Sequence, residues 1–197
     1  MKASFSGSAA GFPLHEFGGV TGTLMMVLTG LLMTVLMQSS SASLTIALTA
    51  AQGGLITVGG AAGMVIGTNV GTTVTALIAA VGATPNAKRT ASAHVLFNLL
   101  TGVVALSLLP WLLALIGVLR DWLGLDAAPA ATLALFHTVF NLLGVALMWP
   151  LVDRLSRFLE RRFRATEEDE ARPRYLDANV AEVPALALDA LQREVRR

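Results

Sequence analysis

The stretch "MQSSSASLTIAL" (Met37–Leu48) places a glutamine and three serines between two apolar runs. No charged residue occurs between positions 17 and 87, on either side of this stretch. A soluble chain of 197 residues could not enclose an uncharged segment of this length in its own core. The segment is therefore predicted to be embedded in a membrane, and the quartet Gln38 to Ser41 then lies among residues suited to hydrocarbon.

The composition agrees with a membrane protein. The chain is 54% hydrophobic and 14% charged, with a mean hydropathy of +0.67, whereas soluble domains carry about 25% charged residues. The net charge is +1, and basic residues are not interleaved with aromatic ones, so nucleic acid is not an expected partner. The absence of cysteine excludes a disulfide framework and a thiolate metal site.

The embedded region contains no recognisable catalytic residues. It has no acidic residue, so a Ser–His–Asp arrangement cannot form there. The chain has no P-loop, and its three histidines lack the carboxylate or cysteine companions of a metal site. We expect a protein that is not an enzyme and needs no cofactor.

The lengths of the apolar segments predict the architecture. Gly19–Met37 is long enough for a membrane span of about 20 residues. Ser41–Ala51 and Leu55–Ile66 are about half that length, and "GTNVGTT" at Gly67–Thr73 separates the second of them from the next apolar run. Such short pieces, divided by glycine and polar residues, are typical of re-entrant hairpins and broken helices that line a cavity.

Two ordinary transmembrane helices are expected next, at Ala91–Leu119 and Leu133–Val152, with Pro110 kinking or shortening the first. The fold class predicted is an all-α integral membrane protein. It consists of one transporter repeat with a re-entrant helical hairpin and a broken helix, followed by two transmembrane helices and a cytoplasmic helical tail.

Charges at the helix ends predict the orientation. Lys88 and Arg89 precede the first of these helices, and the basic segment Asp153–Arg164 follows the second. Two crossings separate the two flanks, so both can lie in the cytoplasm under the positive-inside rule. The loop around Asp121 would then face the outside, and the protein would be a multi-pass protein of the cell inner membrane with a cytoplasmic C-terminal tail.

The chain divides by composition into four parts. A charged, proline-containing linker follows the membrane region, and an amphipathic helix then begins near Pro184 with Leu188, Leu191 and Val195 on one face. The predicted parts are an N-terminal segment, a membrane transport repeat, the linker and the start of a cytoplasmic helical region, at 1–18, 19–152, 153–183 and 184–197.

The serine quartet allows two interpretations. Serine is a preferred N-cap, so one hydroxyl could simply end a helix that begins near Ser41. A cap needs only one hydroxyl, however, and each unsatisfied polar group in hydrocarbon costs several kcal/mol. Amide N–H groups and hydroxyls at a helix N-terminus can bind an anion without lysine or arginine, and hydroxyl oxygens also suit a hard cation such as sodium. We favour the functional interpretation.

A second polar cluster lies in the interrupted segment: Thr68, Asn69, Thr72 and Thr73. Glycines recur there every four residues, at Gly59, Gly63, Gly67 and Gly71. Such a stripe favours close helix packing, which we expect most clearly at Gly59 and Gly63. Packing does not account for the polar side chains.

A short echo links the two later helices. "HVLFN" (His94–Asn98) recurs as "HTVFN" (His137–Asn141), so each helix carries a His and an Asn four residues apart on one face. Hydrogen bonding across the helix bundle is the favoured interpretation, and a proton relay is the alternative.

At these residues the chain resembles the type II sodium/phosphate cotransporter family. "QSSSA" (Gln38–Ala42) matches the family hallmark, and "GTNVGTTVTA" (Gly67–Ala76) resembles its Gly–x–Asn–x–Gly–Thr–Thr element. "KRTASAHVLFN" and "FHTVFN" resemble the helices that come after it in the family, so the likeness covers roughly positions 19 to 152. The tail resembles the stretch that leads into the PhoU-like helical domain of bacterial members.

The resemblance implies transport of inorganic phosphate together with sodium as the coupling ion. The implied substrate and ion site consists of Gln38, Ser39, Ser40, Ser41, Thr68, Asn69, Thr72 and Thr73. Sodium would be held through the oxygens of Gln38, Ser41, Asn69 and Thr73.

The family's transporters carry two inverted QSSS repeats that share one site, whereas this chain has one copy. We expect it to be the C-terminal half, which needs a second transporter repeat from an upstream half, from a separate half-protein or from a homodimer. A homodimer of opposite orientations conflicts with the charge bias. The alternatives are a truncated, non-transporting membrane protein with an anchoring or regulatory role, and a transporter of another anion.

Overall fold

The computed structural model describes residues 19–164, 175, 180 and 184–195. The predicted N-terminal segment, 1–18, and most of the predicted linker beyond Arg164 lie outside the described residues. The described part contains helices and no strands. These helices are α1 (Gly19–Met37), α2 (Ser40–Gln52), α3 (Val58–Ala79), α4 (Pro85–Ser107), α5 (Leu109–Trp122), α6 (Pro129–Met148), the 3-10 turn η2 (Trp149–Leu151), α7 (Val152–Arg162) and α10 (Pro184–Val195).

Four helical segments in the described part of the chain are long and apolar enough to cross a membrane. They are α1, α3, α4 and the continuous stretch Pro129–Arg162, which joins α6, η2 and α7. The prediction of an all-α membrane protein is confirmed.

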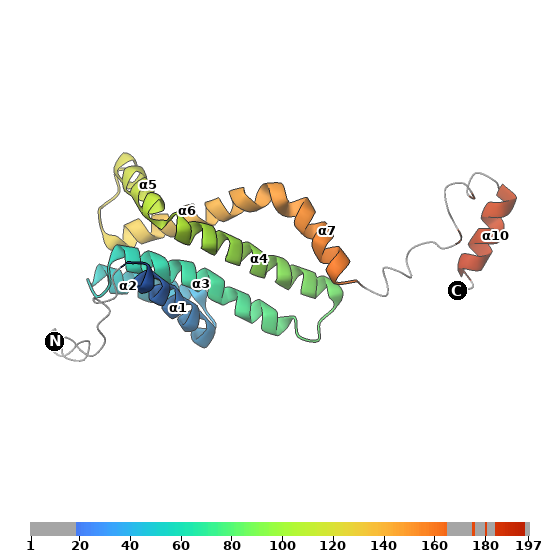
Figure 1. Cartoon of the computed structure of the whole chain (residues 1–197), viewed down its shortest axis with the longest axis horizontal. Coiled ribbons are helices and arrows are strands. Elements are labelled where there is room, and N and C mark those ends of the chain that lie inside the picture. Colours follow the sequence, from blue (N-terminus) through green and yellow to red (C-terminus); the bar gives the residue numbers. More distant parts are fainter. Residues whose placement is uncertain (1–18, 165–174, 176–179, 181–183, 196–197) are drawn as a thin grey trace.

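The predicted helical hairpin is present. α1 and α2 fold back on each other beside α3 (Figure 1), joined by a tight turn at Gln38 and Ser39. α2 has 13 residues, which gives it a length of about 20 Å. That is shorter than the roughly 30 Å of a hydrocarbon core, so α2 cannot cross a bilayer by itself.

The predicted broken helix is wrong. α3 is one continuous helix of 22 residues that runs through "GTNVGTT" without interruption. Glycine inside a helix costs about 1 kcal/mol relative to alanine, but α3 is the central helix of the bundle and packs against α1, α2, α4 and α6. Two of its glycines lie directly on the α1 backbone, so close packing offsets the weak helix propensity of the segment.

Pro110 acts as predicted, but the break it causes is complete. The expected helix Ala91–Leu119 is two helices that meet at Leu108, with Pro110 in the first turn of α5. α4 begins earlier than expected, because Thr84 caps it through a hydrogen bond from the Ala87 amide and Pro85 occupies its first position.

The two basic flanks meet at one end of the bundle, as the predicted orientation requires. Arg89 Nε on α4 donates to the carbonyl oxygen of Phe163, just beyond α7, at 3.0 Å. α4 therefore runs from the basic end of the bundle to the opposite end, and α6 and α7 return to the basic end. Figure 1 shows α7 returning toward the start of α4.

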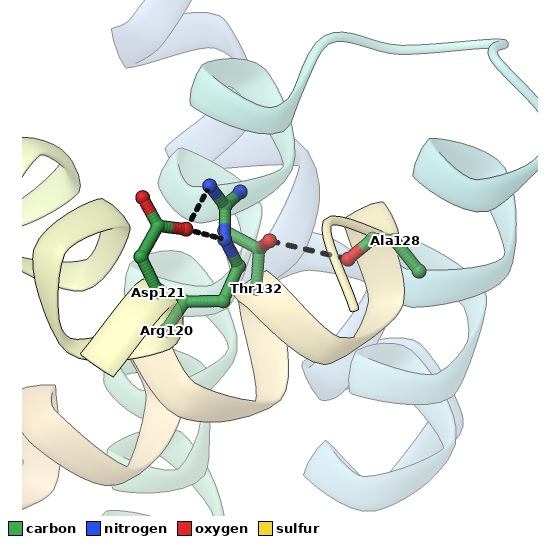
Figure 2. Close-up of polar contacts among 4 residues, drawn as sticks. All are labelled: Arg120, Asp121, Ala128 and Thr132. Carbon is green, nitrogen blue, oxygen red and sulfur yellow. Dashed lines mark hydrogen bonds and ion pairs between the residues drawn. The ribbon is translucent and has the colours of Figure 1, made fainter. Parts of the chain in front are cut away.

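The far end carries the loop between α5 and α6. There Arg120 and Asp121 form an ion pair at 2.7 Å (Figure 2), and Thr132 Oγ1 donates to the carbonyl oxygen of Ala128 at the start of α6. The Asp121 side chain is largely exposed. This loop lies at the opposite end from Lys88 and Arg89, as predicted.

Candidate functional site

The turn between α1 and α2 depends on a strained residue. Gln38 has φ of +52° and is the only described non-glycine residue in the left-handed region. This conformation costs a non-glycine residue roughly 1–2 kcal/mol. Its side-chain Nε2 donates to the carbonyl oxygen of Val35 at 2.6 Å, which satisfies one end of α1.

Ser39 caps α2, and the helix therefore starts one residue earlier than predicted. The Ser39 backbone is extended, and its Oγ accepts a hydrogen bond from the Ala42 amide at 3.2 Å. The carbonyl of Ser39 accepts from both the amide and the hydroxyl of buried Ser43. These contacts leave the amides of Ser40 and Ser41 without a partner among the described residues, at the positive end of the helix dipole.

This arrangement of Gln38 to Ser41 at the start of α2 is called the lip below. Gln38 and Ser41 are exposed, and Ser39 and Ser40 are half-buried, so the lip is open on one side. No charged side chain belongs to it, and its polar groups are neutral amides and hydroxyls. It can thus bind an anion only through hydrogen bonds and the helix dipole.

The polar residues of α3 divide between two neighbouring faces of that helix. Residues four apart share a face, so Thr68 lies with Thr72, and Asn69 lies with Thr73. The glycines Gly67 and Gly71 form the next face, which packs on α1. α2 contacts α1, α3 and α6.

The threonine hydroxyls of α3 donate hydrogen bonds within their own helix. Thr68, Thr72 and Thr73 each donate from Oγ1 to the carbonyl three residues earlier, at 2.6 to 2.8 Å. A hydroxyl that donates in this way keeps its oxygen lone pairs as acceptors. Such oxygens suit a cation and cannot donate to an anion.

Asn69 faces α6 and joins the two recognised motifs. Its Nδ2 donates to Asn141 Oδ1 at 3.3 Å, which confirms that one residue of the His–Asn echo bonds across the bundle. Asn141 Nδ2 and Asn98 Nδ2 in turn donate to the carbonyls of His137 and His94 on their own helices. The two His–Asn pairs therefore form the same hydrogen bond within their helices. Among the described contacts, Asn98 bonds only within α4.

Thr34 is a polar residue of this region that the sequence motifs did not reveal. It lies on α1, is 1% exposed, and packs against Gly71 of α3. Its Oγ1 has no hydrogen-bond partner, and it is the one such buried side-chain atom among the described residues. The signal was available in the four-residue spacing of the buried positions of α1, namely Gly22, Met26, Gly30 and Thr34.

The structure brings the lip and the α3 cluster into one region without joining them. Thr34 packs at Gly71 and precedes the lip by four residues, so the lip lies beside the C-terminal part of α3. No hydrogen bond links Gln38, Ser39, Ser40 or Ser41 to the α3 cluster within the described residues. Asn69 bonds to Asn141 of α6, and Thr68 and Thr72 lie on the neighbouring face of α3.

The chain is similar in sequence to several known proteins. The profile of the family described as Na+/Pi-cotransporter matches residues 18–149. The chain is 31% identical over 185 residues to the "Putative inorganic phosphate export protein YjbB" of Escherichia coli (strain K12), an alignment that covers 92% of this chain and 33% of the relative. It is 37% identical over 133 residues to the "Uncharacterized protein YqeW" of Bacillus subtilis (strain 168), covering 68% of this chain and 41% of the relative.

No solved structure shows a significant match to the chain. The chain spans about one third of the length of the Escherichia coli relative. The family match covers the hairpin, α3, α4, α5 and α6. The chain belongs to the Na+/Pi-cotransporter family.

Proposed function

We propose that this chain forms one half of a sodium-coupled transporter of inorganic phosphate. It would act as a carrier and not as an enzyme, with sodium as the coupling ion and no cofactor. The observation that carries the proposal is the pair of unpartnered amides, Ser40 and Ser41, at the start of a helix too short to cross a bilayer.

Phosphate fits the lip by its hydrogen-bonding capacity. Its oxygens can accept from the amides of Ser40 and Ser41 and from nearby hydroxyls, at the positive end of the α2 dipole. The hydroxyl donors proposed for phosphate are those of Ser40 and Ser41, because neither donates a hydrogen bond within the described part of the chain.

Sodium fits oxygen atoms that can act only as acceptors, because any proton they carry is already used in a hydrogen bond. The Thr68 and Thr72 hydroxyl oxygens keep lone pairs as acceptors, and the Gln38 and Asn69 amide oxygens are further acceptors. We propose that sodium binds between the lip and α3 through Gln38 and Ser41, with Asn69 and Thr73 reached when the hairpin moves. The cation would then neutralise part of the phosphate charge in a site without lysine or arginine.

The exposed side of the lip supports the proposal of a second repeat. A bound phosphate at this position would contact the chain on one side only, and an ion in hydrocarbon needs ligands on all sides. We propose that a second repeat of inverted orientation covers this face. The basic end of the bundle is proposed to face the cytoplasm of the cell inner membrane.

The proposed direction of transport is set by the sodium gradient to which phosphate movement is coupled. Sodium-driven symport would carry phosphate into the cell, whereas the name of the Escherichia coli relative refers to export. Both directions can use the same site, because a carrier runs in the direction that its combined gradients favour. The proposal here is symport.

The test is the flux of radiolabelled phosphate in membrane vesicles from cells that produce this chain together with the second repeat. An inward sodium gradient should drive phosphate uptake, and replacement of sodium by choline should remove it. Equal uptake with choline would contradict sodium coupling. Sulfate or arsenate that competes as well as phosphate would instead assign the lip to oxyanions in general, because its neutral donors carry no phosphate-specific group.

A further inference from the structure

A groove lies at the basic end of the bundle, far from the loop of Asp121. It has a volume of about 690 Å³ and runs between α4 and α7. That volume falls within the roughly 300–1,000 Å³ range of small-molecule sites. Its walls are mostly apolar and include Ala93, Phe97, Met148, Leu155 and Leu159.

The rim of the groove is polar and contains both charges. Arg89 lies there, held by hydrogen bonds to the carbonyl oxygens of Phe163 and Glu160 and to Asn86 Oδ1. The Glu160 carboxylate also lies at the rim, where it accepts a hydrogen bond from Ser156 at 3.1 Å. An apolar channel with a polar mouth fits an amphiphile better than it fits a small ion.

α7 forms one wall of the groove and is strongly amphipathic. Val152, Leu155 and Leu159 recur every three to four residues and face the groove. The arginines Arg154, Arg157 and Arg161 lie on the opposite side and are exposed. From 152 to 164 five arginines stand against two carboxylates, so this short segment carries three net positive charges.

Two exposed aromatic side chains lie on or beside α7. Trp149 is 79% exposed at the bend between α6 and α7, and Phe158 is 59% exposed beside the arginine face of α7. Tryptophan is enriched at the boundary between hydrocarbon and headgroups. A helix with an apolar face, exposed aromatic residues and arginines on the other face lies in that boundary region.

We propose that the groove between α4 and α7 binds an anionic phospholipid. An acyl chain occupies the apolar channel, and the headgroup phosphate lies at the rim within the positive field of Arg89 and the α7 arginines. Anionic lipid is selected because each arginine or lysine near a surface strengthens binding to it about fivefold. Free phosphate lacks the apolar part that the walls of the groove would cover.

The test uses the fluorescence of Trp149, which adjoins the groove residue Met148. The chain has three tryptophans, and Trp111→Phe with Trp122→Phe leaves Trp149 as the sole reporter. The full chain is reconstituted with phosphatidylglycerol or phosphatidylcholine whose acyl chains are brominated. Brominated phosphatidylglycerol should quench Trp149 at a several-fold lower mole fraction than brominated phosphatidylcholine.

Variants distinguish lipid binding in the groove from lipid binding elsewhere on the protein surface. Ala93→Leu fills the channel and should abolish the preference, whereas Ala79→Leu, on an exposed position at the end of α3, should keep it. Arg154→Gln, Arg157→Gln and Arg161→Gln lie on the surface of α7, and each should weaken the preference up to about fivefold.

Equal quenching by the two lipids would overturn the proposal, as would an unchanged preference in Ala93→Leu. Loss of the preference on adding free phosphate at constant ionic strength would assign the site to an anion and not to a lipid. None of these readouts depends on transport, so failure of the lipid site and failure of the transport proposal are distinguishable.

Discussion

At the scale of single residues, Gln38 combines two roles that can be separated. Its backbone forms the left-handed turn between α1 and α2, and its side chain supplies an amide to the lip. Glycine adopts this backbone conformation without strain but has no amide.

We therefore expect Gln38→Gly to raise the stability of the protein by about 1 kcal/mol and to lower phosphate transport. Gln38→Ala removes the amide and keeps the strain, so it should lower transport without the gain in stability. Thermal unfolding in detergent and phosphate flux measure the two effects. A Gly variant that unfolds at a lower temperature than the parent would show that the turn is not strained.

Thr34 offers a second test at this scale, because its buried hydroxyl has no partner. A buried polar group without a hydrogen bond costs about 1–3 kcal/mol. Thr34→Val should therefore stabilise the protein. Thr101→Val is the matched control, since the similarly buried Thr101 hydroxyl donates to the Phe97 carbonyl at 2.7 Å and its loss should destabilise.

Denaturant unfolding distinguishes the two threonine variants. If Thr34→Val destabilises as much as Thr101→Val, then the Thr34 hydroxyl has a partner in the working protein. Sodium-dependent stability of the parent that disappears in Thr34→Val would identify that partner as the coupling ion.

At the scale of helices, α3 shows what the sequence could and could not predict. The hairpin was predictable because charge-free flanks and a serine cap leave few alternatives for a 13-residue helix. The continuity of α3 was not, because glycine and threonine lower helix propensity locally, whereas the packing that compensates comes from α1, about 40 residues earlier in the chain.

The glycine stripe of α3 packs on α1 at Gly63, as predicted, and also at Gly67 and Gly71, whereas Gly59 does not. A Cβ at Gly67 would overlap the carbonyl of Val27, and one at Gly71 would lie 2.7 Å from the Cβ of Thr34. A Cβ at Gly59 would have only Leu113 Cδ1 nearby, at 3.9 Å. The spacing alone could not show which glycines face α1 and which face the end of the bundle.

Substitution of these glycines by alanine tests the packing of α1 on α3. Gly67→Ala should destabilise by about 1–3 kcal/mol because the helix must move away from α1. Gly59→Ala should be neutral or slightly stabilising, since alanine favours the helix and meets ordinary contact distances. Thermal unfolding of both variants measures the difference, and equal effects would exclude the close α1–α3 contact.

At the scale of the whole molecule, the bundle has one basic end and one end with a single described ion pair. Arg89 fixes the basic end by bonding to the carbonyl of Phe163 beyond α7. The positive-inside rule then predicts the orientation of the whole chain from that one end. The candidate site lies between the ends, where only neutral polar groups occur.

The absence of cysteine makes this orientation testable without background labelling. Arg164→Cys lies at the basic end, and Asp126→Cys lies in the loop between α5 and α6. An impermeant maleimide added to intact spheroplasts should label Asp126→Cys only, and membrane disruption should expose Arg164→Cys. Labelling of both from outside would contradict the two crossings of α4 and α6.

The central claim is that the lip of α2 binds the transported phosphate. The most direct measurement is sodium-driven phosphate flux in vesicles that contain the parent chain, Ser40→Ala or Ser107→Ala. Ser107 is an exposed serine of α4 whose hydroxyl bonds within its own helix. The account predicts that Ser40→Ala lowers flux at least tenfold at unchanged protein level while Ser107→Ala leaves it intact, and unaltered flux in Ser40→Ala would contradict it.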